Sequence, residues 1–440
     1  MRSPHLLRAR PGGLTRTGTG GRRAAWSVLD QILSSVTNFA LAIVVAKLGD
    51  KYELGAFEVV FSVYLFASGC SRALGAEPLL VRHSDTDTDD LESAAASAVG
   101  TSLVAGLVAA VPCLAVAAVI GDGPLALPLV ALGVTLPALL VQDAWRYVFF
   151  AAGRPAKALV NDLVWGMVLV ALIVWLLVGP NPSVAALVLA WGGSAAVAAV
   201  LGVWQTGLVP RPSATGPWLR RQRDLVPRFL GEFVVGQGAA QLSIWLVGGV
   251  GGLGVLGALR AAGVLVGPAR LFLTAAPGAA IPELIRIRRR SPERFQRLVA
   301  VMSWGLALSV GVWMAAVLAV PDRYGEALLG ANWAPGRRIF LLIGLSWAAL
   351  GLGTGAMVAL RVLADAKGSF RARMLICPVV LVVPPISVAV GGEMGAAAGI
   401  AAVSFWSAGV WWAVYRQSLQ AAGERPVAEA SFDATVDALD

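Results

Sequence analysis

Apolar segments of about 20 residues or more recur along the whole chain, and short clusters of Gly, Pro or charged residues separate them. A helix of about 20 apolar residues is long enough to span the hydrocarbon core of a bilayer. Since 57% of the residues are hydrophobic and only 14% are charged, a soluble globular enzyme, a disordered chain and a fibrous repeat are excluded. The sequence predicts an all-α polytopic membrane protein with about twelve transmembrane helices. The predicted spans cover residues 25–46, 55–81, 94–120, 125–150, 159–179, 183–206, 228–248, 253–282, 298–320, 337–360, 372–391 and 395–415.

Lysine and arginine residues are distributed unevenly between the two sides of these spans. Of 35 such residues, 27 lie in the segments of one side, five lie on the other side, and three fall within spans. Basic loops remain in the cytoplasm, so both termini are predicted to be cytoplasmic, in a bacterial cytoplasmic membrane. The net charge of +9 then reports orientation, and no nucleic-acid partner is expected. The basic cytoplasmic rim also suits anionic membrane lipids.

No segment between the predicted spans is long enough to form a separate domain. No G-x-x-x-x-G-K-[ST] motif occurs, so the chain is not expected to hydrolyse ATP. With only two histidines, and three cysteines in apolar stretches, neither a metal site nor another cofactor nor a disulfide framework is expected. The expected parts are a basic cytoplasmic N-terminus (1–24), an N-terminal six-helix bundle (25–206), a cytoplasmic linker (207–227), a C-terminal six-helix bundle (228–417) and a disordered acidic cytoplasmic tail (418–440).

The two halves of the sequence resemble each other after a shift of about 202 residues. The shift grows to 204 where residues 78–82 meet 282–286, and to 215 where Arg146 meets Arg361 and Gly153 meets Gly368. Each half has six spans, so the halves should share one topology and be related by a pseudo-twofold axis along the membrane normal. Transporters with parallel repeats have this arrangement and work by alternating access. The matches at a shift of 202 are Asp30 with Glu232, Gly49 with Gly251, and Leu54-Gly55-Ala56 with Leu256-Gly257-Ala258.

Short motifs in both halves add a family resemblance. They are Leu29-Asp30-Gln31, Asn38-Phe39-Ala40, Leu54-Gly55-Ala56-Phe57, Leu256-Gly257-Ala258-Leu259-Arg260-Ala261, Ile281-Pro282-Glu283-Leu284 before an Arg-rich loop, and Leu328-Leu329-Gly330-Ala331-Asn332-Trp333. Together with twelve spans, these motifs over residues 25–415 resemble the polysaccharide (O-antigen type) flippases of the multidrug/oligosaccharidyl-lipid/polysaccharide exporter superfamily.

The resemblance implies a transporter and not an enzyme. Its expected cargo is an oligosaccharide linked to polyprenyl diphosphate, moved from the inner to the outer leaflet between two six-helix bundles. Coupling to protons, sodium or the membrane potential is compatible with the superfamily. The expected partners are the lipid-linked glycan, membrane lipids, and a glycan polymerase or glycosyltransferases.

Three other functions are open alternatives. A multidrug exporter of the same superfamily would be expected to place acidic and aromatic residues in its cavity, whereas the charges at mid-depth here are arginines. A membrane-bound glycan polymerase or ligase would need a large outer loop, and the longest outer loop, about 321–336, offers only Asp322 and Glu326 as catalytic candidates. A non-transporting membrane subunit of a glycan-assembly complex is the third alternative.

Two arginines within predicted spans are candidate substrate contacts. Arg72 lies ten residues before Arg82, which is about 15 Å along a helix and near mid-depth. Arg270 follows Gly267-Pro268 in the other half. A guanidinium suits phosphate because its planar fork donates two parallel hydrogen bonds. The structural alternatives are pairing of Arg72 with Glu77 or Asp30, and packing or snorkelling of Arg270.

Several acidic residues are candidates for other roles. Asp30 and its repeat mate Glu232 are coupling candidates, since a desolvated carboxylate can exchange protons near neutral pH. Interfacial charges at helix N-termini are the structural alternative for both. Glu77, just before Pro78, is a further cavity candidate.

Two groups of charges are gate candidates. Glu58 and Arg260 are repeat mates that are expected to pair near the outer face, as an outer gate, or else to be separate interfacial charges. Near the cytoplasmic side, Asp143 and Arg146 are three residues apart and should share a helix face, beside Asp162. A structural ion pair is the alternative to an inner gate at this place.

Overall fold

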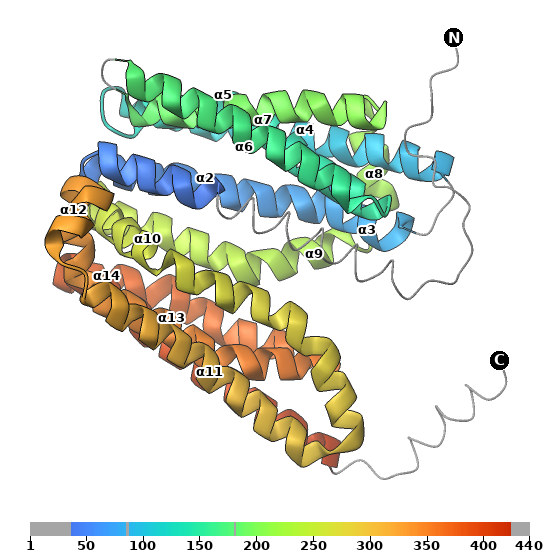
Figure 1. Ribbon diagram of the computed structural model, residues 1–440. Coiled ribbons are helices and arrows are strands. Elements are labelled where there is room, and N and C mark those ends of the chain that lie inside the picture. Colours follow the sequence, from blue (N-terminus) through green and yellow to red (C-terminus); the bar gives the residue numbers. More distant parts are fainter. Residues whose placement is uncertain (1–36, 85–87, 180–181, 424–440) are drawn as a thin grey trace. The chain divides into compact units, whose positions relative to one another are not determined.

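The computed structural model describes residues 37–84, 88–179 and 182–423, and every regular element in these ranges is a helix (Figure 1). Nine continuous helical runs among them are long and apolar enough to cross a membrane, so the chain is a multi-pass membrane protein. Besides the helical segment Thr37–Leu48, the elements are α2 (Lys51–Ser71), η1 (Arg72–Ala76), α3 (Glu77–His83), α4 (Thr88–Ile120), α5 (Ala126–Ala151), α6 (Pro155–Val178), α7 (Val184–Thr206), η2 (Pro212–Ala214), α8 (Thr215–Arg221), α9 (Val226–Phe233), η3 (Val234–Gly238), α10 (Ala239–Arg290), α11 (Pro292–Leu318), α12 (Asp322–Leu329), η4 (Gly330–Asn332), α13 (Trp333–Val362) and α14 (Ala366–Gly423).

Two of these runs are longer than a membrane crossing needs because each contains a reversal at a glycine. Gly252 in α10 has φ 78° and Gly392 in α14 has φ 55°, a left-handed conformation that favours glycine. A Cβ atom added at Gly395 would lie 2.1 Å from the carbonyl oxygen of Ser387, so the two arms of α14 pack against each other. When both runs are divided at these glycines, the nine runs become eleven passes, and the helical segment Thr37–Leu48, which is the described part of the first predicted span, is the twelfth.

The chain forms two compact units, of which the first contains helices of both sequence halves and the second contains residues of the second half alone. The first comprises residues 1–264 and 321–337, and the second comprises residues 265–320 and 338–440. The division into six-helix bundles at residues 207–227 stays a prediction. The end of the chain differs from expectation in one respect, since α14 continues to Gly423, beyond the predicted start of the tail at residue 418.

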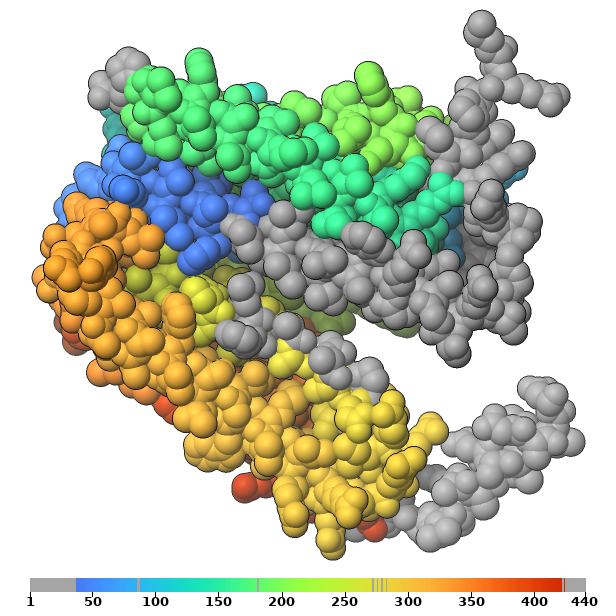
Figure 2. Space-filling model, viewed as in Figure 1, coloured from blue at the N-terminus to red at the C-terminus, as the bar shows by residue number. Residues whose placement is uncertain are grey.

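The apolar faces of these helices fit a lipid environment. In α11 of the second unit, which belongs to the yellow-orange part of Figure 2, large exposed side chains follow one another at helical spacing. In water, another protein surface would have to cover such an apolar stripe, whereas in a membrane the lipid tails cover it. These side chains are Val301, Trp304, Leu308 and Val312.

The predicted repeat is visible in the packing of α2 against α10 within the first unit. A Cβ atom added at Gly55 would lie 1.9 Å from the Leu253 carbonyl oxygen, and one added at Gly257 would lie 1.9 Å from the Lys51 carbonyl oxygen. Both glycines and both carbonyls are related by the same shift of 202 residues. The contact is therefore reciprocal, as in an isologous interface between two copies of one motif.

A second pair of matching turns corrects the register of the later repeat. After α5, the Ala152, Gly153 and Arg154 N–H groups donate to Val148, Phe150 and Phe149. After α13, the same three bonds recur 211 residues later, from Leu363, Ala364 and Asp365 to Ala359, Arg361 and Leu360. Gly153 and Ala364 also share a positive φ, of 64° and 56°. The predicted shift of 215, which paired Arg146 with Arg361, is wrong by about one helical turn.

Candidate functional site

A π-helical turn in the second membrane pass carries Arg72. This turn, Arg72–Ala76, stands directly before Glu77 and Pro78. Pro78 has no N–H to donate to the Leu74 carbonyl, four residues earlier in the helix. The Trp218 indole of α8 donates to that carbonyl instead, at 2.9 Å. π-Helical turns of this kind often occur at functional sites, and here the linker helix stabilises one.

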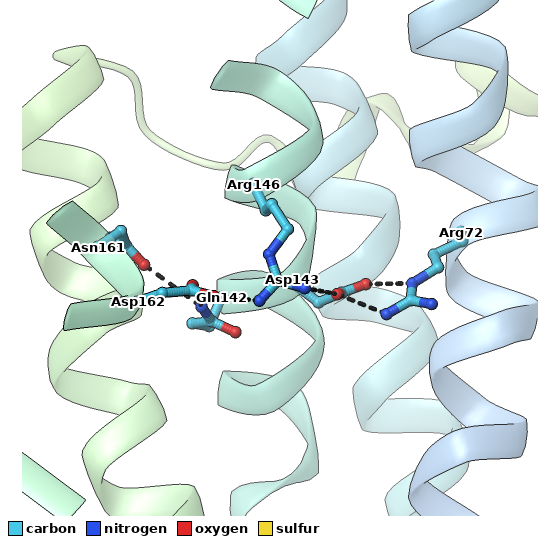
Figure 3. A network of polar contacts seen from close by, with 6 residues as sticks. All are labelled: Arg72, Gln142, Asp143, Arg146, Asn161 and Asp162. Carbon is cyan, nitrogen blue, oxygen red and sulfur yellow. Dashed lines mark hydrogen bonds and ion pairs between the residues drawn. The ribbon is translucent and has the colours of Figure 1, made fainter. Parts of the chain in front are cut away.

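The Arg72 guanidinium is held by a carboxylate of α5. Its Nε and Nη2 donate to the two oxygens of Asp143 at 2.7 and 2.8 Å, which is a bidentate pair (Figure 3). Of the two structural partners predicted for Arg72, Glu77 is not its ion-pair partner and has to be corrected, whereas Asp30 lies outside the described residues. The reason is geometric, because Asp143 approaches from a neighbouring helix and offers both oxygens at once.

A second arginine continues the same network. Arg146 lies 3.8 Å from Asp143 on the same face of α5, as its spacing predicts, but its closer partner is Asp162 of α6. The Arg146, Asp143 and Asp162 side chains are only 9%, 5% and 1% exposed. Two guanidiniums and two carboxylates therefore neutralise one another where an unpaired charge would be costly.

Amide groups complete the hydrogen bonding around Asp162. Gln142 donates to an Asp162 oxygen at 2.8 Å, and Asn161 donates to the Ala198 carbonyl at 2.8 Å and to Gln205 at 3.1 Å. The network thus joins η1, α5, α6 and α7 within the first unit. Sequence reasoning missed Asn161 because a lone asparagine in an apolar helix gives no signal about its neighbours.

One end of this network is open. The Arg72 side chain is 34% exposed and its guanidinium carbon lies 5.6 Å from the ring centre of Tyr147. Arg72 is therefore the member that an anion could reach without unfolding the network. Asp143 holds its guanidinium in a fixed orientation, which lowers the entropy lost on binding.

Glu77 and Glu232 are brought together, although they are 155 residues apart in sequence. Glu77 is half-buried, Glu232 of α9 is exposed, and the two carboxylates are close enough to interact electrostatically. The two residues were predicted for separate roles, and no pattern in the sequence indicated that they lie close together. Their predicted roles in cargo binding and coupling stay predictions.

Arg270 belongs to the second unit. It is exposed, and its guanidinium carbon lies 5.4 Å from the centre of the Trp347 ring, which is a cation–π contact. This contact agrees with the packing alternative for Arg270. Its predicted role as a phosphate contact stays a prediction.

Glu58 and Arg260 form the ion pair that the repeat predicts. Arg260 donates to Glu58 at 2.9 Å, and each side chain is 14% exposed. The guanidinium also lies 4.6 Å from the ring centre of Phe61 and 5.3 Å from that of Phe57. The pair is three residues beyond the glycine crossing on both helices, which is about one helical turn along each helix. Its gate function stays a prediction.

A sequence motif of the same unit makes a further contact between distant segments of the chain. Asn332 is fully buried, and its amide donates to the carbonyls of Ala46 and Gly49 at 2.8 and 2.7 Å. These carbonyls end the helical segment Thr37–Leu48, where carbonyls lack helical donors. The motif Leu328–Trp333 therefore ties a late segment of the chain to the first pass.

No cluster of three or more His, Cys, Asp or Glu residues that could hold a metal ion occurs in the part of the chain that the structure describes. Cys70, Cys113 and Cys377 are free thiols. The polar groups that the site brings together are arginines, carboxylates and amides, which offer hydrogen bonds and charge.

Comparison with known proteins identifies the fold. No family model and no curated protein matches the sequence. Lipid II flippase MurJ in an inward closed conformation matches with a TM-score of 0.68 at 10% identity, over 89% of this chain and 90% of that one. An inward-facing multidrug resistance MATE transporter of the MOP superfamily matches with a TM-score of 0.58 at 14% identity, over 90% and 98%. A MATE transporter in a straight conformation gives 0.58 at 13% identity, over 96% and 99%.

Identities this low show the fold alone. All three solved structures are those of transport proteins. The narrower resemblance to O-antigen-type flippases stays a prediction. The chain is a multi-pass membrane protein with the transporter fold that MurJ and the MATE transporters of the MOP superfamily share.

Proposed function

We propose that this protein flips a polyprenyl-diphosphate-linked oligosaccharide from the inner to the outer leaflet of the bacterial cytoplasmic membrane by alternating access. The observation that carries the proposal is the fold similarity to a lipid II flippase, whose TM-score of 0.68 exceeds the 0.58 of the two MATE structures above. The motifs at the outer end of the second and eighth passes support the same family. Glycan polymerases or glycosyltransferases would supply or consume the cargo.

Arg72 is the proposed contact for the diphosphate. It is partly exposed and already oriented by Asp143. An incoming phosphate oxygen would compete with Asp143 for the guanidinium, and Asp143 would then keep Arg146 as its neighbour. The carboxylate thus holds the arginine ready in the empty site and stabilises the network when cargo binds.

The outer end of the first unit supplies the proposed closure. Outward opening would have to break the Glu58–Arg260 pair or the bonds of Asn332 to the first helix. Such polar contacts can be present in one state and broken in the other. The helices that meet at Gly55 and Gly257, in contrast, are too close to slide past each other. We assign the glycine crossing as the pivot and the polar contacts as the gate. Asp30 and Glu232 remain the proposed coupling carboxylates for protons, sodium or the membrane potential.

The second candidate is a multidrug exporter, which the MATE similarities favour. A cationic drug needs an uncompensated carboxylate, whereas Asp143 and Asp162 are each paired with an arginine. Binding of cationic dyes to the purified protein separates the two candidates. Saturable binding that Asp143→Asn abolishes would favour the exporter.

A deletion strain tests the proposal. Lipid-linked oligosaccharides are extracted and their leaflet exposure is compared with the parent strain and with a strain carrying the gene on a plasmid. Accumulation on the cytoplasmic leaflet, reversed by the plasmid, is the expected result. Unchanged leaflet distribution, in a strain shown to hold no second flippase, would contradict the proposal and favour the exporter or a non-transporting subunit.

A further inference from the structure

The segment that follows the sixth pass is anchored onto the first unit at two points. The Arg211 N–H donates to the Ala96 carbonyl at 2.9 Å, and a Cβ atom added at Gly100 would lie 2.3 Å from the Arg211 backbone. Seven residues later, Trp218 is buried and donates to the Leu74 carbonyl. This linker is therefore packed in a defined position against α4 and the π-helical turn.

The anchored linker closes a cavity of about 540 Å³ against α3 and α4. Three arginines from separate elements line it: Arg82 from α3, Arg211 before η2 and Arg221 at the end of α8. Ser93 and Ser97 of α4 add hydroxyl groups to the wall. By the distribution of basic residues, this end of the unit faces the cytoplasmic headgroup region.

The charged side chains that line the cavity differ in how many partners they have. Arg82 donates to the Arg221 carbonyl at 2.8 Å and to Gln222 at 2.9 Å, and it also pairs with Asp224. Asp90, the carboxylate in the cavity wall, is close enough to His83 to interact electrostatically. Within the described residues, the side chains of Arg211 and Arg221 make no ion pair. Two guanidiniums are thus available at the rim of a preformed cavity.

We infer that this cavity is a binding site for a phosphate or diphosphate group, as a free anion or as the headgroup of an anionic lipid. Arginine forks match phosphate oxygens in pairs, and the Ser93 hydroxyl group provides a further donor, whereas Ser97 donates to the Ser93 carbonyl. An anionic lipid would reach the cavity from the cytoplasmic leaflet, where the negative surface potential also concentrates basic segments. The inference concerns binding alone and is independent of the proposed flippase activity.

The chain offers a matched pair of variants for the test. The double variant Arg211→Ala, Arg221→Ala removes both available guanidiniums. Arg220→Ala, Arg223→Ala removes the same charge from the same linker, but neither residue lines the cavity. Equal thermal unfolding temperatures of the two variants would establish that both fold.

The experiment measures binding to the full-length protein in two arms. In the first, isothermal titration calorimetry in detergent follows inorganic diphosphate. In the second, native mass spectrometry counts phosphatidylglycerol retained from nanodiscs of phosphatidylglycerol and phosphatidylcholine. We expect the Arg211/Arg221 variant to lose about tenfold in affinity in at least one arm, and the control variant to lose little. The arm that responds identifies the source of the phosphate.

Three results would overturn the inference. They are the absence of wild-type binding in both arms, an equal loss in the two variants, which would indicate a diffuse charge effect, and an unchanged affinity of the Arg211/Arg221 variant. Since none of these measurements requires transport, their failure is distinguishable from failure of the flippase proposal.

Discussion

The fourth and fifth passes differ from their counterparts in the second half, although the two turns that follow α5 and α13 have the same hydrogen bonds. At the shift of 211 residues that these turns define, the charged network has no equivalent. Gln142, Asp143, Arg146, Asn161 and Asp162 correspond to Gly353, Thr354, Met357, Ala372 and Arg373. One scaffold is thus used twice, with buried carboxylates in one copy only.

The difference indicates whether the fold itself needs the charges of the network. Around Ala356 and Leu360, the second copy is stabilised by an apolar cluster. Around Trp145 and Phe149, the first copy has a similar apolar cluster beside its charges. Since apolar packing suffices in one copy, the charges in the other are not required by the fold, and recognition of cargo is their proposed use.

The largest expected effect comes from breaking the charged network. Arg146→Leu leaves Asp162 buried without its cationic partner, and the free energy of unfolding should fall by about 3 to 5 kcal/mol. Thr354→Val, at the position that corresponds to Asp143, removes only a hydroxyl that bonds to the Leu350 carbonyl, and should cost about 1 kcal/mol or less. Thermal unfolding in detergent measures both. Equal stability of Arg146→Leu and wild type would contradict the mutual neutralisation of the four buried charges.

The glycine crossing tests the symmetry of the repeat. Gly55→Ala and Gly257→Ala each place a methyl group against a backbone carbonyl, and each should destabilise by about 1 to 3 kcal/mol. The two losses should be similar because the contact is reciprocal. Gly249→Ala is the control, since nothing lies within 4 Å of its added Cβ atom. Loss of stability in one crossing variant but not in the other would break the symmetry.

A smaller effect separates two tryptophans with similar hydrogen bonds. Trp218 donates to Leu74 and Trp412 donates to Leu352. The Leu352 carbonyl keeps a helical donor in Ala356, whereas Pro78 deprives Leu74 of one. Trp218→Phe should therefore cost about 1 to 2 kcal/mol, and Trp412→Phe about half as much. A larger loss in Trp412→Phe would contradict this explanation of the π-helical turn.

The smallest effect concerns a surface charge outside the spans. Hydrogen bonds from its own backbone N–H, and then from Arg82, lower the pKa of Asp224 below its usual value. A lowered folded-state pKa gives a stabilisation that is present above the unfolded-state pKa and is lost as pH falls through the folded one. The wild type should therefore be slightly more stable than Asp224→Asn at about pH 6, and the two proteins should be equally stable near about pH 2. A wild-type advantage that persists unchanged at the acid end would contradict the assignment.

Much of the fold could be predicted because its determinants are local. The length of an apolar segment determines a membrane pass, and a Gly-Gly break such as Gly391-Gly392 allows a reversal. The pairing of Glu58 with Arg260 followed from the repeat, which relates distant residues by one shift. The later register was wrong because only two matches, Arg146 with Arg361 and Gly153 with Gly368, defined it, and two single-residue matches do not exclude a register that differs by one helical turn.

The charge network could not be predicted in the same way. Arg72 and Asp143 are 71 residues apart, and nothing in either segment specifies which helix faces which. The same holds for Trp218, whose role depends on a carbonyl left without a helical donor by Pro78. Such contacts arise from tertiary packing, which periodicity and composition do not encode.

The central claim is that the purified chain moves a lipid-linked glycan between leaflets, with Arg72 as a phosphate contact. The direct measurement is the rate at which a fluorescent polyprenyl-diphosphate oligosaccharide becomes accessible to an external quencher in proteoliposomes. We predict that the wild type transports the lipid. We predict that the double variant Arg72→Gln, Arg270→Gln inserts normally but transports no faster than empty liposomes. A wild-type rate equal to that of empty liposomes, or a variant as fast as the wild type, would contradict the account.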